Sequence, residues 1–132
     1  TMNDLERIIY ILNTVPLYRK YTIDNMVNLI LPAIKNKQYL IISNKETPLY
    51  FVTWTFLCQQ ASDEYEFKKR ILRAEDWNSG VIPWVIDCVC PYGGIFSANR
   101  QLVKVLKDSG VKGKVKFFRY KRGKNELRYV RI

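Results

Sequence analysis

The residue in this chain with the clearest chemical potential is a carboxylate placed in an apolar segment. Asp87 lies between Trp84-Val85-Ile86 and Cys88-Val89-Cys90, and the β-branched and aromatic residues around it predict a strand buried on both faces. A lone acid in such a strand costs several kcal/mol unless another group pairs with it or donates a hydrogen bond to it. We therefore expect a polar partner for Asp87 elsewhere in the chain.

The residue types that are absent or sparse also limit the chemistry. The chain has no histidine, which excludes His-based catalysis, His metal ligands and a Ser-His-Asp arrangement. Its three cysteines, Cys58, Cys88 and Cys90, lack the spacing of a metal site, so we expect no metal and no bound cofactor. Cys88 and Cys90 flank one strand residue and point to the same face. They could approach each other, but we expect free thiols in a cytoplasmic protein.

The formal net charge of +10 is concentrated toward the C-terminus. Residues 1–96 carry ten Lys and Arg and ten Asp and Glu, whereas residues 97–132 carry twelve Lys and Arg and two Asp and Glu. This asymmetry favours an acidic partner, which would be a nucleic acid, an acidic carrier protein or a phosphate-bearing ligand. A solvated basic face that keeps the protein soluble is the alternative.

Length and composition predict one globular domain over residues 1–132, with a basic C-terminal helix and hairpin over residues 97–132. A chain of 132 residues that is 48% hydrophobic can bury a core of its own. No apolar run approaches the roughly 18–20 residues that a membrane-spanning helix needs. Asp4 and Glu6 interrupt the N-terminal segment, so we expect no signal peptide.

Hydrophobic periodicity predicts the order α-α-β-β-α-β-α-β-β. The predicted helices cover residues 3–13, 22–34, 59–72 and 97–110, and the predicted strands cover residues 38–43, 48–57, 84–90, 114–120 and 126–132. Pro32 should kink or break the second helix. This order predicts an α+β fold with a single, mostly antiparallel sheet flanked by helices.

Several short segments together resemble the RTX-toxin-activating lysine acyltransferases, whose fold is GNAT-like. These segments are Pro16-Leu17-Tyr18-Arg19, Leu31-Pro32-Ala33-Ile34 with Gln38-Tyr39, Val52-Thr53-Trp54, Ala74-Glu75-Asp76-Trp77-Asn78-Ser79-Gly80, and Trp84-Val85-Ile86-Asp87 followed by Pro91-Tyr92-Gly93. Each is weak alone, but all five occur in the order of that family. The resemblance is expected to fade beyond residue 96.

The resemblance implies an acyl transfer to an amine. Members of that family take a fatty acyl chain from acyl-acyl carrier protein and place it on lysines of a protoxin. Their implied catalytic pair is an aspartate, which corresponds to Asp87, and a histidine, whose position is occupied here by Tyr18. A serine that is common just before the proline of the first motif is replaced by Val15.

The tyrosine leaves three roles open at this position. A phenol with a reference pKa of about 10 is a poor base at pH 7, unless a cation such as Arg19 lowers its pKa by several units. It remains suited to act as a general acid toward a leaving thiolate. Alternatively, Tyr18 only hydrogen-bonds Asp87 and has no part in a reaction.

The resemblance and the charge also point to binding residues. The usual GNAT pyrophosphate loop is absent, and Gly93-Gly94 before a helix is the nearest candidate for a phosphate or thioester carbonyl. Arg19 is a further candidate for donor binding. On the basic segment, the candidates are Arg100 and Lys104 for an acyl donor, and Lys114, Lys116 and Arg119 for a protein partner.

Two functions therefore stand side by side. The first is a lysine acyltransferase that uses acyl-acyl carrier protein or acyl-CoA as co-substrate, with Asp87 and Tyr18 as its altered pair. The second is an inactive GNAT-like binding module, such as a phage or mobile-element inhibitor, that binds an acidic protein or nucleic acid. Aromatic residues beside the basic ones in the last two strands also suit single-stranded nucleic acid. A homodimer is left open.

Overall fold

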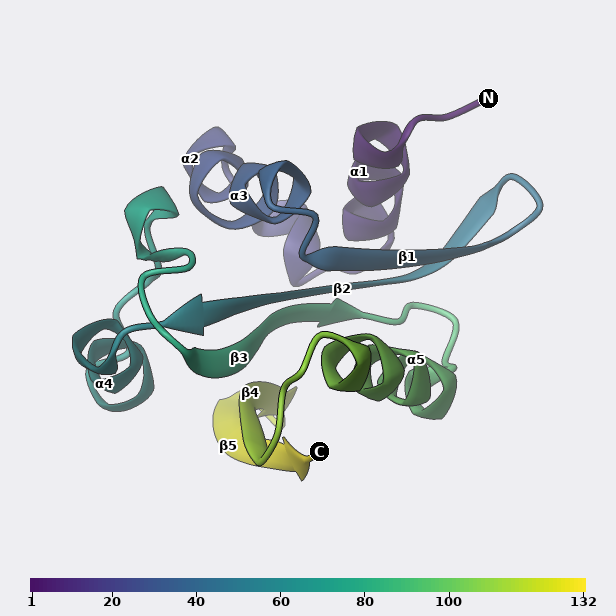
Figure 1. Ribbon diagram of the computed structural model, residues 1–132. Helices are drawn as coiled ribbons and strands as arrows, with labels where there is room; N and C mark the ends of the chain where they lie inside the picture. The colour runs from purple at the N-terminus through teal and green to yellow at the C-terminus, as the bar shows by residue number, and fades with distance from the viewer.

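The computed structural model describes all 132 residues and confirms the predicted order of elements and the α+β fold (Figure 1). The helical elements are α1 (Asp4–Thr14), η1 (Tyr18–Lys20), α2 (Ile23–Asn25), η2 (Met26–Ile30), α3 (Leu31–Lys35), α4 (Gln59–Phe67), η3 (Ala74–Asp76) and α5 (Ile95–Asp108). The strands are β1 (Tyr39–Asn44), β2 (Thr47–Leu57), β3 (Ile82–Val89), β4 (Lys114–Lys121) and β5 (Lys124–Arg131). No helix is both long and apolar enough to span a membrane.

The five strands form one sheet in the order β1-β2-β3-β4-β5. All neighbours are antiparallel except β3 and β4, which are parallel because α5 connects them as a crossover. These two strands pair only at Trp84 and Lys116, and β4 and β5 then turn away from β3 (Figure 1). One edge of β3 beyond Trp84 is therefore left without a neighbouring strand.

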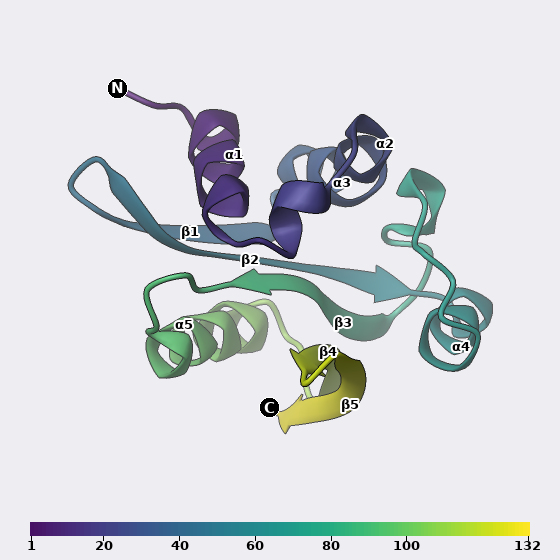
Figure 2. The same cartoon turned by 180° about the vertical axis from the view of Figure 1, so that it is seen from behind.

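Helices cover both faces of the sheet. Helix α5 lies against one face, and α1 with the α2–η2–α3 segment lies against the other (Figures 1 and 2). On the α5 side, Leu102 and Leu106 pack against Tyr50 and Val52. On the opposite side, the core consists of two clusters, whose buried members are Ile8, Ile11, Leu12, Ile30, Phe51 and Val89 in one and Leu29, Leu57, Ala61, Leu72 and Trp84 in the other.

Pro32 shapes the second helical segment, as the sequence predicts. Its ring carries no N–H, which in a regular α-helix would donate to the carbonyl of Asn28, four residues earlier. The segment before it widens into the π-helical turn η2, and the indole Nε1 of Trp77 donates to the Asn28 carbonyl at 2.9 Å. The Asn28 side chain in turn accepts from the backbone N–H of Ala74 at 2.9 Å. Two hydrogen bonds to Asn28 thus join the turn before Pro32 to the segment that contains Ala74 and Trp77.

Two predicted boundaries differ from the structure. Helix α4 ends at Phe67 rather than at residue 72, because Lys69 has a left-handed backbone with φ 55° and Arg70 turns back to bind Glu64 and Asp76. Helix α5 begins at Ile95, two residues before the predicted start, because Gly94 has φ 80° and turns the chain directly into the helix.

Candidate active site

An irregularity in the ladder between β2 and β3 places Asp87. Val52 pairs with Cys88 and Trp54 pairs with Val85, so β3 contains one residue more than β2 between these two pairs. An extra residue of this kind is a β-bulge, which interrupts the alternation of side chains and re-aims one of them. Beyond the bulge, Asp87 faces the side of the sheet that α1 and η1 cover.

Asp87 is almost completely enclosed, with 4% of its surface exposed. Its Oδ1 accepts a hydrogen bond from the hydroxyl of Tyr21 at 2.7 Å, and its backbone N–H donates to Oγ1 of Thr53 at 3.0 Å. Its Oδ2 is buried and has no partner. The expected partner for the carboxylate therefore exists, but it satisfies only one of the two oxygens.

Burial dominates the acidity of this carboxyl. Removal from water disfavours the charged form and raises the pKa of Asp87 to about 6, and the hydrogen bond from Tyr21 offsets part of that rise. At neutral pH most of the carboxyl is ionised, yet it binds a proton far more readily than an exposed aspartate. A group with a pKa close to the working pH is suited to proton transfer.

Tyr18 lies beside Asp87 without bonding to it. The hydroxyl that holds the carboxylate belongs to Tyr21, whose ring meets the ring of Tyr18 edge-on at 5.3 Å. The expectation that Tyr18 itself holds Asp87 is thus wrong in this detail. Tyr21 could have been found from the sequence. It is three residues after Tyr18, and residues three apart in a 3₁₀ turn lie on the same side of that turn.

The phenols around Asp87 are held in their protonated form. Burial, followed by the negative charge of Asp87, raises the pKa of Tyr18, of Tyr21 and of Tyr65. Arg19 is exposed, forms no ion pair and is not among the groups that shift the pKa of Tyr18, so the condition under which Tyr18 could act as a base is not met. Sequence reasoning missed Tyr65, because only the tertiary fold brings α4 to β3.

A pocket of about 310 Å³ opens next to Tyr18. It lies between the α1–η1 connection and the end of β3. Its lining residues are Thr14, Val15, Pro16, Tyr18, Cys88, Val89, Cys90 and Pro91. The pocket brings together two of the motifs that carry the resemblance, and it adjoins the strand edge that has no neighbour.

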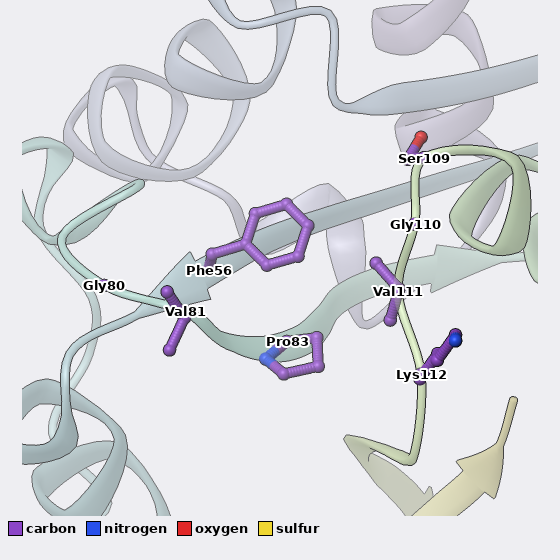
Figure 3. Close-up of a pocket in the computed structure, with 8 residues that line it drawn as sticks. All are labelled: Phe56, Gly80, Val81, Pro83, Ser109, Gly110, Val111 and Lys112. Carbon is purple, nitrogen blue, oxygen red and sulfur yellow. The ribbon is translucent and has the colours of Figure 1, made fainter.

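A second pocket of about 310 Å³ lies at the opposite end of β3. Phe56, Val81 and Pro83 line it from the strand ends, and Val111 and Lys112 line it from the connection between α5 and β4 (Figure 3). It contains no carboxylate, thiol or phenol and none of the predicted site residues. The Tyr18 pocket is therefore the better candidate for chemistry.

The remaining predicted donor-binding residues lie outside that pocket. Gly93 and Gly94 form the exposed turn into α5, with φ 84° and 80°, and a Cβ at either position would meet open space. They are needed for the left-handed turn rather than for a close approach. Arg100 and Lys104 are exposed one turn apart on α5.

The predicted partner residues on β4 are largely engaged within the molecule. Nζ of Lys116 binds Oε1 of Glu66 at 2.6 Å, and Arg119 lies 3.7 Å from Glu126. Nζ of Lys114 lies 4.5 Å from the ring centroid of Tyr129. Lys116 is therefore half-buried and already paired within the molecule. No group of three or more acidic or thiol side chains is arranged to hold a metal ion.

The fold and the site define a GNAT-like α+β domain with a buried carboxylate on its central strand. The model of the RTX toxin acyltransferase family matches residues 2–132, and the chain belongs to that family. The match includes the basic C-terminal segment, so the expectation that the resemblance fades beyond residue 96 is wrong.

Relatives of known function agree with the family match. The chain is 27% identical over 114 residues to a leukotoxin-activating lysine-acyltransferase of Pasteurella haemolytica-like sp. (strain 5943B), and the match covers 79% of this chain and 69% of the relative. It is 29% identical over 91 residues to an RTX-II toxin-activating lysine-acyltransferase of Actinobacillus pleuropneumoniae, covering 69% and 57%. It is 32% identical over 78 residues to a protein-lysine myristoyltransferase of Escherichia coli, covering 59% and 46%. The chain thus spans about half to two thirds of the length of these relatives.

Proposed function

We propose that this chain is a protein lysine acyltransferase of the toxin-activating type. It would move a fatty acyl group from acyl carrier protein, or from acyl-CoA, to the side-chain amine of a lysine in a protein substrate. One observation carries the proposal: a buried, half-satisfied carboxylate stands beside a pocket in a domain whose relatives are named lysine acyltransferases. We expect it to act in the cytoplasm, where its free cysteines stay reduced.

The first chemical requirement is a neutral amine. A lysine ammonium has a reference pKa of about 10.4, which falls when the group leaves water. Oδ2 of Asp87 is enclosed and has no partner within the protein, so an amine that enters the site can give its proton to this oxygen. The raised pKa of about 6 makes this carboxylate a stronger base than an exposed aspartate. Asp87 therefore takes the role of base that the missing histidine would otherwise fill.

The second requirement is stabilisation of the departing thiol. Tyr18 keeps its proton at neutral pH because burial and the charge of Asp87 raise its pKa. Its hydroxyl can donate a hydrogen bond to the sulfur as the carbon–sulfur bond breaks. Full proton transfer is unnecessary, because a thiolate is a weaker base than a phenolate. Tyr18 accordingly acts as a donor and not as a base.

The third requirement is a binding place for the donor's arm, the extended chain that joins the acyl group to the carrier protein or to the rest of CoA. The edge of β3 beyond Trp84 offers unpaired backbone groups beside the pocket. An extended arm that contains amide groups can pair with such an edge as an added strand does. The exposed side chains of Arg100 and Lys104, on the helix that follows β3, suit an acidic carrier protein at the outer end of that arm.

Intact-mass measurement tests this function directly. The folded protein is mixed with acyl-acyl carrier protein and a lysine-bearing protein substrate, and the mass of one acyl group on the substrate is the expected result. Asp87→Asn should lower the rate by about 100-fold or more. Asp108→Asn, an exposed change on α5, is the matched control and should not change the rate. Transfer that persists in Asp87→Asn would contradict the site.

An inactive binding module is the second candidate, and the observation that favours it is Tyr18 in place of a histidine. In that case the folded wild-type chain transfers no acyl group to any lysine, but still binds an acidic carrier protein or a nucleic acid. Binding without transfer under the conditions above would support this candidate. Transfer by the wild type would exclude it.

A further inference from the structure

A side chain of β2 holds the backbone of Asp87 at the β-bulge. Thr53 stands there opposite two residues of β3, Ile86 and Asp87, and none of the three has a partner across this ladder. The residue that a bulge adds is left without its regular ladder pairing. The backbone N–H of Asp87 donates to Oγ1 of Thr53 at 3.0 Å. A side-chain oxygen thus supports the backbone at the point where the ladder is interrupted.

This hydrogen bond lies in the interior of the protein. Thr53 is fully buried, and Asp87 is almost completely enclosed. A buried N–H that loses its acceptor costs free energy, because water is absent to replace that acceptor. Loss of the Thr53 oxygen would therefore favour a rearrangement of the bulge. Because a shift of one residue along a strand turns a side chain to the other face of the sheet, such a rearrangement would re-aim the carboxylate.

Two hydrogen bonds from different parts of the fold fix Asp87. Thr53 holds its backbone from the sheet, and Tyr21, which follows η1, donates to its Oδ1 at 2.7 Å. Neither bond occupies Oδ2, which is buried and has no partner. Thr53 is β-branched and therefore stiff at χ1, so its oxygen gives the bulge a fixed point of attachment. The free carboxylate oxygen is thus aimed by contacts at the other end of the residue.

We propose that Thr53 is a positioning residue for acyl transfer, whose hydroxyl oxygen fixes the bulge so that Oδ2 of Asp87 faces the lysine amine. Thr53 takes no proton and contacts neither the acyl donor nor the acceptor. It acts only through the placement of Asp87. This inference rests on the proposed function, in which Asp87 is the base.

The chain offers a matched control two residues away. Thr55 lies on the same face of β2, is fully buried, and accepts at its Oγ1 from the backbone N–H of Asn78 at 3.1 Å. A valine at either position keeps the β-branched shape and removes one hydrogen bond to a backbone N–H. Thr53→Val and Thr55→Val should therefore cost comparable stability, but only Thr53→Val should disturb Asp87.

Rates of acyl transfer separate positioning from support of the fold. Under conditions in which every variant is folded, Thr53→Val should lower kcat by about 10- to 100-fold and change KM less than about 3-fold. Thr55→Val should change neither. Thr53→Ser returns the oxygen and should restore kcat to within about 5-fold of the wild type. If Thr53→Val does not fold, the comparison of Thr53→Ser with Thr53→Ala isolates the same oxygen.

A double-mutant cycle tests whether Thr53 acts through the carboxylate. In an Asp87→Asn background, Thr53→Val should lower the residual rate of transfer no further, because the group that Thr53 positions is already lost. A residue that supports the fold in general would lower the rate by the same factor in both backgrounds.

A second measurement does not depend on acyl transfer. If Thr53 keeps Asp87 within reach of Tyr21, the stability that Tyr21→Phe removes should fall by at least about half in a Thr53→Val background. It should stay unchanged in a Thr55→Val background. Urea denaturation of the single and double variants measures this coupling.

The outcomes separate this inference from the proposed function. If Thr53→Val transfers acyl groups at the wild-type rate, or if Tyr21→Phe costs the same stability in every background, the positioning role is overturned and the proposed function stands. If the coupling to Tyr21 is found but the wild type transfers no acyl group, Thr53 still positions Asp87 and the proposed lysine transfer fails.

Discussion

Asp87 is kept in a place where a neutral side chain would be more stable. Its folded pKa of about 6 lies above the ordinary value of 3.8, so the folded protein binds this proton more tightly than the unfolded chain. The stability that this proton contributes is present below about pH 4 and is lost as the pH rises through about 6. Above that pH the ionised carboxylate costs up to about 3 kcal/mol, because each tenfold difference in proton affinity corresponds to about 1.4 kcal/mol.

Asp87→Asn should therefore stabilise the protein while it stops acyl transfer. The amide is neutral, and its carbonyl oxygen can still accept the hydrogen bond from Tyr21. We expect a gain of about 1–3 kcal/mol in the free energy of unfolding at pH 7.5, which shrinks toward zero near pH 4. Urea denaturation of both proteins across this range measures the difference. A gain that does not depend on pH would contradict the raised pKa.

Tyr21 and Tyr18 should separate stability from activity. Tyr21→Phe removes the only side-chain donor to the carboxylate and should cost about 1–3 kcal/mol at pH 7.5. The cost should be smaller at pH 5, where the carboxyl is largely protonated. Tyr18→Phe removes a hydroxyl that donates to no side chain, so it should reduce acyl transfer more than stability. Urea denaturation at both pH values, paired with transfer rates, provides the check, and equal stability losses would count against the assignment.

At the scale of elements, periodicity located the strands and helices, but pairing determined the site. The apolar alternation of β3 is a local property, and it predicted a strand around Asp87 correctly. The bulge is a property of the β2–β3 register, so no single strand reveals which face Asp87 occupies. The same limit explains why the charge pattern placed Lys116 at the surface, where it would be free to bind a partner. Its partner Glu66 comes from α4, whose position depends on the whole sheet.

The link between η2 and the loop after α4 yields a prediction about packing. Trp77 is buried and satisfies the Asn28 carbonyl that Pro32 leaves free. Trp77→Phe keeps an aromatic ring but removes the donor, so we expect a loss of about 2–4 kcal/mol in the free energy of unfolding. In a Pro32→Ala background, the restored N–H of residue 32 can reach the same carbonyl.

A double-mutant cycle of Trp77→Phe and Pro32→Ala tests that explanation. The cost of Trp77→Phe should fall by about 1 kcal/mol when Pro32 is replaced, because the carbonyl then has a donor within the helix. Urea denaturation of the four proteins gives the coupling energy. Additive costs, equal in both backgrounds, would mean that Trp77 stabilises the segment only by packing.

For the whole molecule, the attraction of an acidic partner depends more on where the excess positive charge lies than on how large it is. The basic residues on β4 are partly neutralised by Glu66 and Glu126, whereas Arg100 and Lys104 on α5 have no acidic partner. These two side chains lie one helical turn apart on an exposed face, directly after the strand that carries Asp87. The long-range attraction of an acidic carrier protein should therefore be strongest at α5.

Charge reversal distinguishes a local docking face from general attraction. Arg100→Glu with Lys104→Glu lowers the formal net charge from +10 to +6, and so does the control pair Lys35→Glu with Lys68→Glu on α3 and beyond α4. We expect the α5 pair to weaken binding of an acidic acyl carrier protein by about 10-fold or more and to flatten its salt dependence, and the control pair to change it little. Titrations at low and moderate salt measure both. Equal losses in the two pairs would show that net charge alone attracts the carrier. Tighter, more steeply salt-dependent binding of single-stranded DNA would favour the binding module.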